Sequence, residues 1–350
     1  MEYSSISTAF IKDFFGLVDK ESKIFITCHY SPDDDAVSSA LSLYYVLTST
    51  YPQKDVNVII TGKPVDRFSV FQNFQKIKFV ADITEVIKND SLVIFLDGSQ
   101  FTRFSNFSEK FSLLSFRSIC IDHHINDREA FTLCLQESTS SSTSELIYLL
   151  CTEFQNNSEF CNLILFGILG DTGTFNYIKP DQTRVFDIVK NILHVSQLDI
   201  QDYKSKYSYI EPQIFEIIKE FIKNTKYKHI QGWPDFTISY VTRSYIQKHR
   251  LTDTQVGQAS DIYTAQYLRV LKGYPWGIAI KPYSDGSCRF SLRSLPGSVN
   301  VRLLMQQMGL GGGHNRAAGG SMGGKDLQVE PNQAFRIISS WLKKNSPVLT

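Results

Sequence analysis

The sequence lacks the features that mark membrane and secreted proteins. No apolar run approaches the roughly 18 residues that a helix needs to span a bilayer, and the most apolar stretches are the short runs 92–96 and 163–169. The N-terminal Met-Glu-Tyr-Ser-Ser contains no basic segment followed by an apolar core, so we expect no secretory signal. The six cysteines are scattered without a Cys-x-x-Cys pair, which excludes zinc-ribbon spacing and favours reduced thiols in a cytoplasmic protein.

The chain also lacks an excess of charge of either sign. It has 36 Lys and Arg against 35 Asp and Glu, a formal net charge of +1. This balance argues against a protein that coats long nucleic acid through bulk electrostatics, although it leaves room for a local basic pocket. With 350 residues, of which 42% are hydrophobic and 20% charged, the composition predicts a folded globular chain of two or three domains.

The first half alternates strand-like and helix-like segments. Apolar, β-branched runs predict strands at 23–28, 56–60, 92–96 and 117–121. Apolar residues at helical spacing predict helices over 36–47, 144–154 and 162–169. This alternation predicts a mainly parallel sheet with helices on both faces. In such sheets ligands bind beyond the carboxyl ends of the strands.

The second half has a different organisation. The pattern is helical from about 185 to 225 and is broken by Gly-Trp-Pro at 232–234. Strands follow at 236–241, 277–281 and 287–292, the last two as a hairpin, with helices over 301–308 and 332–344. We therefore predict an α/β protein with three parts: a first domain (1–195), a helical linker (196–234) and a smaller C-terminal α/β domain (235–350). The only low-complexity segment is the Ser/Thr run 138–144.

Four polar clusters follow apolar segments of the first domain. Each alone is also explained by turn chemistry, including Asp35 as the cap of the next helix. His123 and His124 follow the expected strand 117–121. If the chain stayed extended there, the two side chains would point in different directions and would serve different roles. The clusters are His29-Tyr-Ser-Pro-Asp33-Asp34-Asp35, Asp97, Asp122-His123-His124 and Gly170-Asp171-Thr172-Gly173.

Taken together, the clusters predict a metal site. Four strand–helix junctions would present six side chains with imidazole nitrogen and carboxylate oxygen. This donor set suits Mn²⁺, with Mg²⁺, Fe²⁺ or Co²⁺ as alternatives. The carboxylates suffice for two ions bridged by one Asp, and two ions about 3.5–4 Å apart can activate water against a phosphate. The candidate ligands are His29, Asp33, Asp35, Asp97, His123 and Asp171.

A further group of candidates lies in the C-terminal domain. The run Gly311-Gly312-Gly313-His314 exposes backbone N–H groups, and it would attract an anion if a helix began there. It fits neither the Walker nor the dinucleotide-binding pattern. Arg289 and Arg293 alternate with apolar residues on the expected strand, so both can face one side and bind phosphate. The alternatives are a flexible turn and a solvated strand face.

In this order, the motifs resemble those of the DHH phosphoesterase family, in the subgroup with a DHH-associated C-terminal domain. The resemblance extends over roughly residues 20–325. The matching segments are His29-x-x-Pro-Asp33-x-Asp35 with Ser38-Ser39-Ala40, Leu96-Asp97 with Arg103, Asp122-His123-His124, Ser141-Ser142-Thr143-x-Glu145, Gly170-Asp171-Thr172-Gly173, Ser291-Leu-Arg293-Ser294 and Gly311-Gly-Gly-His314-x-x-Ala-Ala-Gly319. The departures are the extra acid Asp34, Val299 in place of an acid, and three glycines where many relatives have four.

The resemblance implies a role for each residue. His29, Asp33 and Asp97 would hold one ion. A second ion would be held by Asp35, Asp97, His123 and Asp171, with Asp97 as the bridge. As catalytic residues, Asp122 would orient a neighbouring ligand, and His124 would contact the phosphate or protonate the leaving group. Substrate would be cleaved between the domains, after binding to Arg289, Ser291, Arg293, Gly311, Gly312, Gly313 and His314.

The function expected from these residues is hydrolysis of short nucleotide phosphodiesters. Candidate substrates are pApA, cyclic di-AMP and oligoribonucleotides of two to five residues (nanoRNA). The alternatives are a 3′-phosphatase for adenosine 3′,5′-bisphosphate and, in another class, a non-catalytic nucleotide sensor. A processive exonuclease would need a basic stripe with regular aromatic residues, which the sequence lacks. The resemblance also makes a homodimer plausible, and nothing in the sequence indicates a membrane partner.

Overall fold

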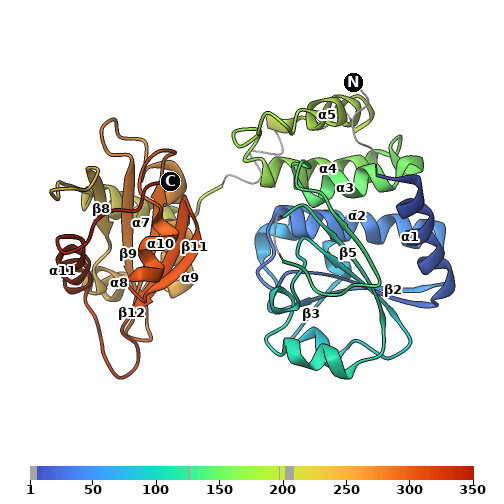
Figure 1. Ribbon diagram of the computed structural model, residues 1–350, viewed down its shortest axis with the longest axis horizontal. Helices are drawn as coiled ribbons and strands as arrows, with labels where there is room; N and C mark the ends of the chain where they lie inside the picture. The colour runs from blue at the N-terminus through green and yellow to red at the C-terminus, as the bar shows by residue number, and fades with distance from the viewer. Residues whose placement is uncertain (1–5, 125–126, 197, 202–208) are drawn as a thin grey trace. The chain divides into compact units, whose positions relative to one another are not determined.

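The chain folds into two compact units, Met1–Tyr207 and Ser208–Thr350. The computed structural model describes residues 6–124, 127–196, 198–201 and 209–350 (Figure 1). Each unit has its own six-stranded sheet and its own hydrophobic core, which confirms the predicted α/β class. Within the described part of the chain, no helix combines the length and apolarity that membrane crossing requires.

The first sheet is parallel throughout. Its strands are ordered β3 (Ile77–Val80), β2 (Asp55–Thr61), β1 (Lys23–Cys28), β4 (Leu92–Leu96), β5 (Arg117–Asp122) and β6 (Leu133–Gln136). The four predicted strands lie within one residue of their observed limits. The two edge strands, β3 and β6, were not predicted because four residues are too few to establish a period.

Two different layers cover this sheet. One face packs against α1 (Thr8–Lys20), α2 (Asp34–Thr50), α3 (Thr143–Leu150) and α4 (Ser158–Asp171), and α5 (Arg184–Ser196) lies outside α4 (Figure 1). The other face meets 3₁₀ helices at Ile83–Glu85, Phe101–Arg103 and Ser108–Leu113. Helices therefore cover both faces, as predicted, but those on the second face are short 3₁₀ helices. These crossovers are rich in Ser, Asn and Phe, which are mediocre helix formers.

The strand order defines where a site can form. From β1 the chain proceeds to β2 and β3 on one side, and from β4 to β5 and β6 on the other. The direction of winding therefore switches between β1 and β4. Cys28 pairs with Leu96, and Leu96 pairs with Ile121, so the ends of β1, β4 and β5 are level. Residues that follow these strands must converge at the switch point, where open α/β sheets bind ligands.

The second unit is built on a mixed sheet. Its order is β11 (Gly311–His314), β12 (Ala317–Met322), β10 (Cys288–Ser294), β9 (Trp276–Pro282), β8 (Phe236–Tyr240) and β7 (Lys226–Lys228). Only β8 and β9 pair in parallel. The β9–β10 pair confirms the predicted hairpin over 277–292. One core contains α10 (Val301–Gln307) and α11 (Pro331–Leu342), and the other contains α7 (Pro212–Lys223) and α9 (Asp253–Gln266).

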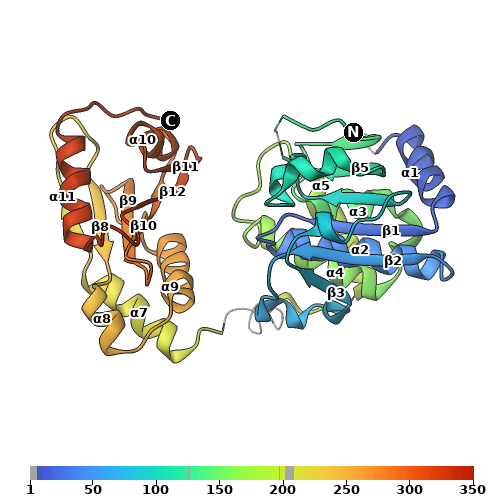
Figure 2. The ribbon, with the colours of Figure 1, turned by 90° about the horizontal axis from the view of Figure 1, so that it is seen from below.

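These two helix pairs lie on opposite faces of the second sheet, and Figure 2 shows α11 and α9 on either side of it. A short helix, α8 (Arg243–Lys248), precedes α9. The span 196–234, interpreted from the sequence as a linker, contributes α7 and β7 to this unit. Ile217 and Phe221 of α7 are buried in the same core as Tyr263 of α9.

The glycine run 311–313 does not begin a helix. The expected anion attraction by a helix N-terminus therefore does not apply to it. It forms β11 and pairs antiparallel with β12. A Cβ at Gly311 would lie 2.2 Å from the carbonyl oxygen of Gly319, and a Cβ at Gly320 would lie 2.5 Å from that of Leu310. The glycines therefore permit a close approach of two backbones.

Candidate metal centre

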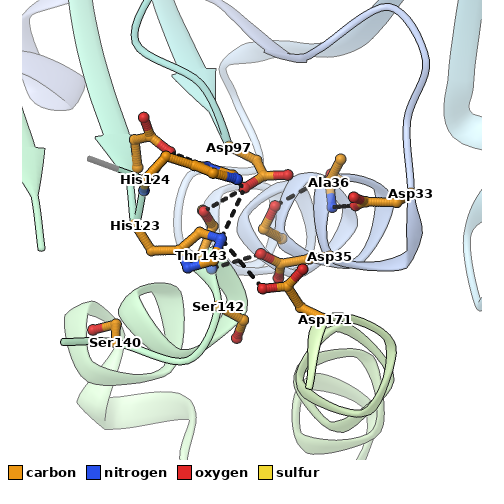
Figure 3. Close-up of polar contacts among 12 residues, drawn as sticks. Asp33, Asp35, Ala36, Asp97, His123, His124, Ser140, Ser142, Thr143 and Asp171 are labelled. Atoms are coloured by element: carbon orange, nitrogen blue, oxygen red, sulfur yellow. Dashed lines mark hydrogen bonds and ion pairs between the residues drawn. The ribbon is translucent and has the colours of Figure 1, made fainter. Parts of the chain in front are cut away.

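Asp97 occupies the middle of the switch point. It follows β4 with φ of 59°, a left-handed conformation that non-glycine residues adopt mainly in turns and at functional sites. Its side chain is buried. One oxygen, Oδ2, lies 3.3 Å from Nε2 of His29. The other, Oδ1, lies 3.5 Å from Nε2 of His123 and 3.6 Å from Nδ1 of His124, and Figure 3 shows both rings beside Asp97.

The acids after β1 differ in their roles. Asp33, not Asp35, caps α2, because its Oδ1 accepts a hydrogen bond from the Ala36 amide at 3.0 Å. The alternative interpretation of Asp35 as the cap is wrong: Asp35 lies inside the first turn and is 1% exposed. The remaining oxygen of Asp33 lies 3.8 Å from Nε2 of His29. Asp33 therefore lies with His29 and Asp97, whereas Asp35 lies with His123 and Asp171.

Two residues that the sequence reasoning left without a role, Thr143 and Ser144, donate hydrogen bonds to Asp35 and Asp97. At the N-terminus of α3, the amides of Thr143 and Ser144 donate to Asp35 at 2.6 and 2.8 Å. The hydroxyl of Thr143 donates to Asp97 at 3.0 Å. The first amides of a helix lack intrahelical partners and favour negative charge. The pattern Ser142-x-x-Glu145 is a helix-start signal and could have located this N-terminus.

The two histidines after β5 share a direction but differ in their partners. Their ring centroids are 4.3 Å apart, and both rings approach Asp97. The divergence expected for an extended segment does not occur. The reason is that β5 ends at Asp122 and the chain turns. His124 Nδ1 lies 2.8 Å from Oδ1 of buried Asp122, whose carboxylate also accepts the His124 amide. His123 instead places Nε2 3.3 Å from Oδ2 of Asp171.

Asp171 reaches the cluster from a helix rather than a strand. It is the last residue of α4, so the prediction of four strand–helix junctions is wrong for this residue. Burial raises its pKa to about 7, with a further contribution from the negative charge of Asp97. The site thus combines the ends of three strands with the end of a helix.

The electrostatics of the cluster reflect crowded carboxylates. Burial raises the pKa of Asp35, and the charges of Asp97 and Asp171 add to the shift. Burial alone would lower the pKa of His29, but hydrogen bonds to Asp33 and Asp97 outweigh it and raise the pKa to about 9. Without a cation, the crowded negative charge therefore favours protonation of an acid such as Asp35 and of His29.

The remaining ring pKa values separate the two adjacent histidines. Burial lowers the pKa of His123. For His124 burial acts in the same direction, but the hydrogen bond to Asp122 prevails and raises the pKa. The same bond overcomes burial at Asp122 and lowers the pKa of its carboxyl group.

The donor atoms fit a divalent cation. Three overlapping groups have ligand atoms within 4.8 Å of one another: His29 with Asp33 and Asp97, Asp35 with His123 and Asp171, and Asp97 with His123 and His124. Among the described residues, Nε2 of His123 is buried without a hydrogen-bond partner, and it faces carboxylate oxygens. A buried nitrogen among oxygens is costly unless a further partner binds there. All six residues expected as ligands meet in this cluster.

The predicted substrate residues gather on a separate surface of the second unit. Phe290 and Leu292 point into the core beneath α10 and α11, so Arg289, Ser291 and Arg293 share the opposite face. Strand pairing places Gly319, Gly312 and His314 beside them on that face. By the same alternation, Gly311 and Gly313 face the other side. The glycines leave this part of the sheet free of bulky side chains.

Lys281 is a residue of this face that the sequence reasoning missed. Its side chain is 9% exposed, and its ammonium donates to the hydroxyls of Ser260 and Ser291 at 3.1 and 3.3 Å. The nearest carboxylate, on exposed Asp261, is 3.8 Å away. Burial lowers its pKa, and the charge of Arg293 adds to the effect. The surface is therefore cationic, in contrast to the acidic cluster of the first unit.

Comparison with known proteins gives a consistent result. Residues 23–168 match the model of the DHH family, N-terminal domain. The chain is 27% identical over 329 residues to a probable bifunctional oligoribonuclease and PAP phosphatase, NrnA, of Streptococcus mutans, covering 89% of this chain and 93% of that protein. It is 24% identical over 357 residues to the cyclic-di-AMP phosphodiesterase GdpP of Geobacillus thermodenitrificans, covering 95% of this chain but only about half (49%) of that protein.

A solved structure extends the likeness to both units. The exopolyphosphatase-related protein of Bacteroides fragilis superimposes with a TM-score of 0.81, covering 97% of this chain and 98% of that one, at 22% identity. At this identity the likeness concerns the fold. The matched segment 23–168 contains the ends of β1, β4 and β5 and the N-terminus of α3, and only Asp171 of the cluster lies beyond it. On this evidence, residues 23–168 are similar to the DHH family, N-terminal domain, and the chain resembles the relatives named above over both units.

Proposed function

We propose that this protein is a two-metal-dependent hydrolase that cleaves phosphodiester bonds in short oligonucleotides or dinucleotides and releases nucleoside monophosphates. The observation that carries the proposal is the position of Asp97, whose two oxygens lie 3.3–3.6 Å from nitrogens of three histidines. A carboxylate placed between two sets of donors is what a bridging ligand requires. The separation of its two oxygens between His29 and the His123–His124 pair supports two ions rather than one.

The residues around Asp97 divide into two ligand sets. His29, Asp33 and Asp97 would hold one ion, and Asp35, Asp97, His123 and Asp171 would hold the other. Imidazole with carboxylate favours Mn²⁺, and Mg²⁺ or Co²⁺ are the alternatives. When bound, such ions polarise phosphate oxygens and make hydroxide available near neutral pH.

The chain's own side chains would complete the site. Because Asp122 accepts a hydrogen bond from the Nδ1–H group of His124, it fixes the ring and leaves Nε2 for the substrate. Nε2 would then donate to a phosphate oxygen or to the leaving oxygen. In the second unit, Arg289 and Arg293 would hold a terminal phosphate, and His314 with the glycine backbone would hold a base or phosphate. This cationic surface supports a substrate that carries phosphate groups.

The relatives support this substrate class and one alternative. The Streptococcus mutans protein is named for two activities, on oligoribonucleotides and on PAP, so a 3′-phosphatase activity on adenosine 3′,5′-bisphosphate is the second candidate. The relative GdpP is named for cyclic di-AMP. A non-catalytic nucleotide sensor is the rival from another class, and the complete set of six candidate ligands argues against it.

The test is a substrate panel with the purified full chain in Mn²⁺, Mg²⁺ and Co²⁺. It contains pApA, cyclic di-AMP, a five-nucleotide RNA, a long single-stranded DNA and adenosine 3′,5′-bisphosphate. Asp97→Ala and His123→Ala are assayed in parallel, and Asp55→Asn is the matched control because Asp55 is an exposed carboxylate. We expect mononucleotide release from the short substrates, abolished by chelation and by both site variants but unchanged in the control.

Three results would contradict the proposal. Turnover that is insensitive to chelation would exclude the metal centre. Binding of Mn²⁺ without turnover of any member of the panel would favour the nucleotide sensor. Release of inorganic phosphate from adenosine 3′,5′-bisphosphate alone would replace the diesterase with the phosphatase.

A further inference from the structure

A buried ion pair lies beneath the candidate metal centre and belongs to none of its ligand sets. Nε of Arg184, in the first turn of α5, lies 2.6 Å from Oε1 of Glu145 in α3. The side chains are 10% and 1% exposed. Removing two charges from water is costly, and apolar residues of similar size often stabilise a fold as well or better. A buried pair at this position therefore calls for a reason other than stability.

The contacts of the pair show what it holds. The second oxygen of Glu145, Oε2, accepts from both the amide and the hydroxyl of Ser141 at 2.7 Å. Nη2 of Arg184 donates to the hydroxyl of Ser140 at 2.7 Å. The side-chain amide of Gln182 donates to the Ser140 carbonyl at 3.0 Å. The turn that leads into α3 is thus fixed from both sides, and every residue from 140 to 145 is buried.

This turn delivers the donors that hold two of the carboxylates. Directly after it, the amides of Thr143 and Ser144 donate to the two oxygens of Asp35, and the Thr143 hydroxyl donates to Asp97. Figure 3 shows Ser142 and Thr143 at the start of α3 beside these acids. A continuous set of hydrogen bonds therefore leads from α5, through Glu145 and the turn, to the cluster.

We propose that Glu145 and Arg184 are positioning residues of the metal centre. The pair keeps the N-terminus of α3 in the place where its amides face Asp35, so that the carboxylate presents a fixed geometry to a cation. This inference rests on the metal centre of the proposed function but not on its substrate. Outer residues that orient ligands typically change metal affinity by about 10–100-fold when they are replaced, and we expect a loss in that range.

The experiment measures Mn²⁺ binding directly, by electron paramagnetic resonance of free Mn²⁺ during titration of the full chain, with thermal unfolding measured alongside. Glu145→Gln and Arg184→Met each break the pair. The double variant Glu145→Met with Arg184→Met replaces it by apolar side chains. Lys219→Met is the matched control, because it breaks an exposed pair with Glu216 on α7.

The double variant separates positioning from stability. We expect both single variants to bind Mn²⁺ about 10–100-fold more weakly and to melt at lower temperature. In the double variant the melting temperature should recover, because no charge is left buried alone. Its Mn²⁺ affinity should stay low, because the Ser141 amide and hydroxyl have lost their acceptor. The surface control should bind as the parent does.

Several outcomes would overturn the inference. Folded single variants that bind Mn²⁺ within twofold of the parent would do so. Recovery of both melting temperature and affinity in the double variant would reduce the pair to a structural role. If the single variants do not fold, the double variant decides the question, and parental Mn²⁺ affinity in the folded double variant would contradict the inference. A parent that binds no Mn²⁺ would refute the metal centre and the inference together, whereas Mn²⁺ binding without turnover refutes only the proposed function.

Discussion

The two units concentrate charges of opposite sign, and they do so by different routes. The first unit collects carboxylates that are far apart in sequence, from Asp33 to Asp171, because parallel strands end at one edge. The second unit collects cations along neighbouring strands, because residues two apart share a face. Topology therefore creates the acidic cluster, and strand alternation creates the cationic surface.

The groups within the two regions respond to burial in the same way. The pKa of Asp171 is raised to about 7 by burial and by nearby carboxylates. The pKa of Lys281 is lowered by burial and by nearby arginines. In each region, burial and neighbouring like charges disfavour the charged form of these groups. A ligand of opposite sign would stabilise the charged form: a cation in the first unit and an anion in the second. Substitutions in the first unit should accordingly impair catalysis on every substrate, whereas substitutions in the second unit should impair substrate binding.

The largest effect is expected from Asp35→Asn in the first unit. The substituted amide group would place a donor against the Thr143 or Ser144 amide, where both carboxylate oxygens now accept. We expect kcat/KM to fall by about a thousandfold or more, on pApA and on the minimal diester bis(p-nitrophenyl) phosphate alike. Steady-state kinetics on both substrates in Mn²⁺ check this. Retention of activity on the minimal diester would show that Asp35 serves substrate binding instead.

A smaller and selective effect is expected from Arg293→Met in the second unit. Loss of one guanidinium contact to a phosphate should raise KM for pApA by about 10–50-fold, with little change in kcat. Turnover of bis(p-nitrophenyl) phosphate should be unchanged, because that probe carries no terminal phosphate. Lys272→Met, an exposed lysine of the same unit, is the control. An equal loss on both substrates would contradict the division of roles between the units.

The acidic cluster could largely be predicted from the sequence because its residues follow apolar strands directly. A strand such as 92–96 is buried on both faces and is easily recognised, so the position of Asp97 follows. The family resemblance then supplied the pairing of His29, Asp33 and Asp97. The local chain direction was not predicted. The turn after β5 brings His123 and His124 together, and Asp171 lies at the end of a helix and not at the end of a strand.

The supporting residues were harder to find because their signal is not periodic. The Ser/Thr run 138–144 has the composition of a loop, yet residues 140–144 are buried and feed α3. Arg184 is 39 residues from Glu145, and no local pattern relates them. In the sequence, Lys281 is not distinguished from any other lysine on a strand. The packing of α9 against the sheet brings Ser260 to its ammonium group. Side-chain networks of this kind depend on tertiary packing, which short-range periodicity does not encode.

A modest effect on stability should follow from Asp171→Asn in the metal-free protein. The carboxyl pKa is about 7 in the folded chain and 3.8 as the ordinary value, so the native state binds the proton more tightly. Stability should therefore fall as pH rises from about 4 to about 7, and the variant should escape this loss. The shift corresponds to about 4 kcal/mol, and we expect on the order of 2 because solvent reaches part of the side chain. Urea unfolding in chelator at pH 5 and 8 checks this.

The smallest effect is expected at Asp82, a buried carboxylate of the same unit with the opposite behaviour. Its oxygens accept from the Thr84 amide and hydroxyl, the Ser105 hydroxyl and the Asn106 amide at 2.7–3.0 Å. Burial would raise its pKa, but these bonds prevail and lower it. Its contribution is present above the ordinary pKa of an aspartate and is lost as pH falls through the lowered value. Asp82→Asn should therefore cost about 1–2 kcal/mol at pH 8 and less at pH 3, with Mn²⁺ affinity unchanged. Asp171→Asn is expected to gain stability at pH 8. The same gain in Asp82→Asn would mean that burial alone governs the pKa of both carboxylates and that hydrogen bonding does not distinguish them.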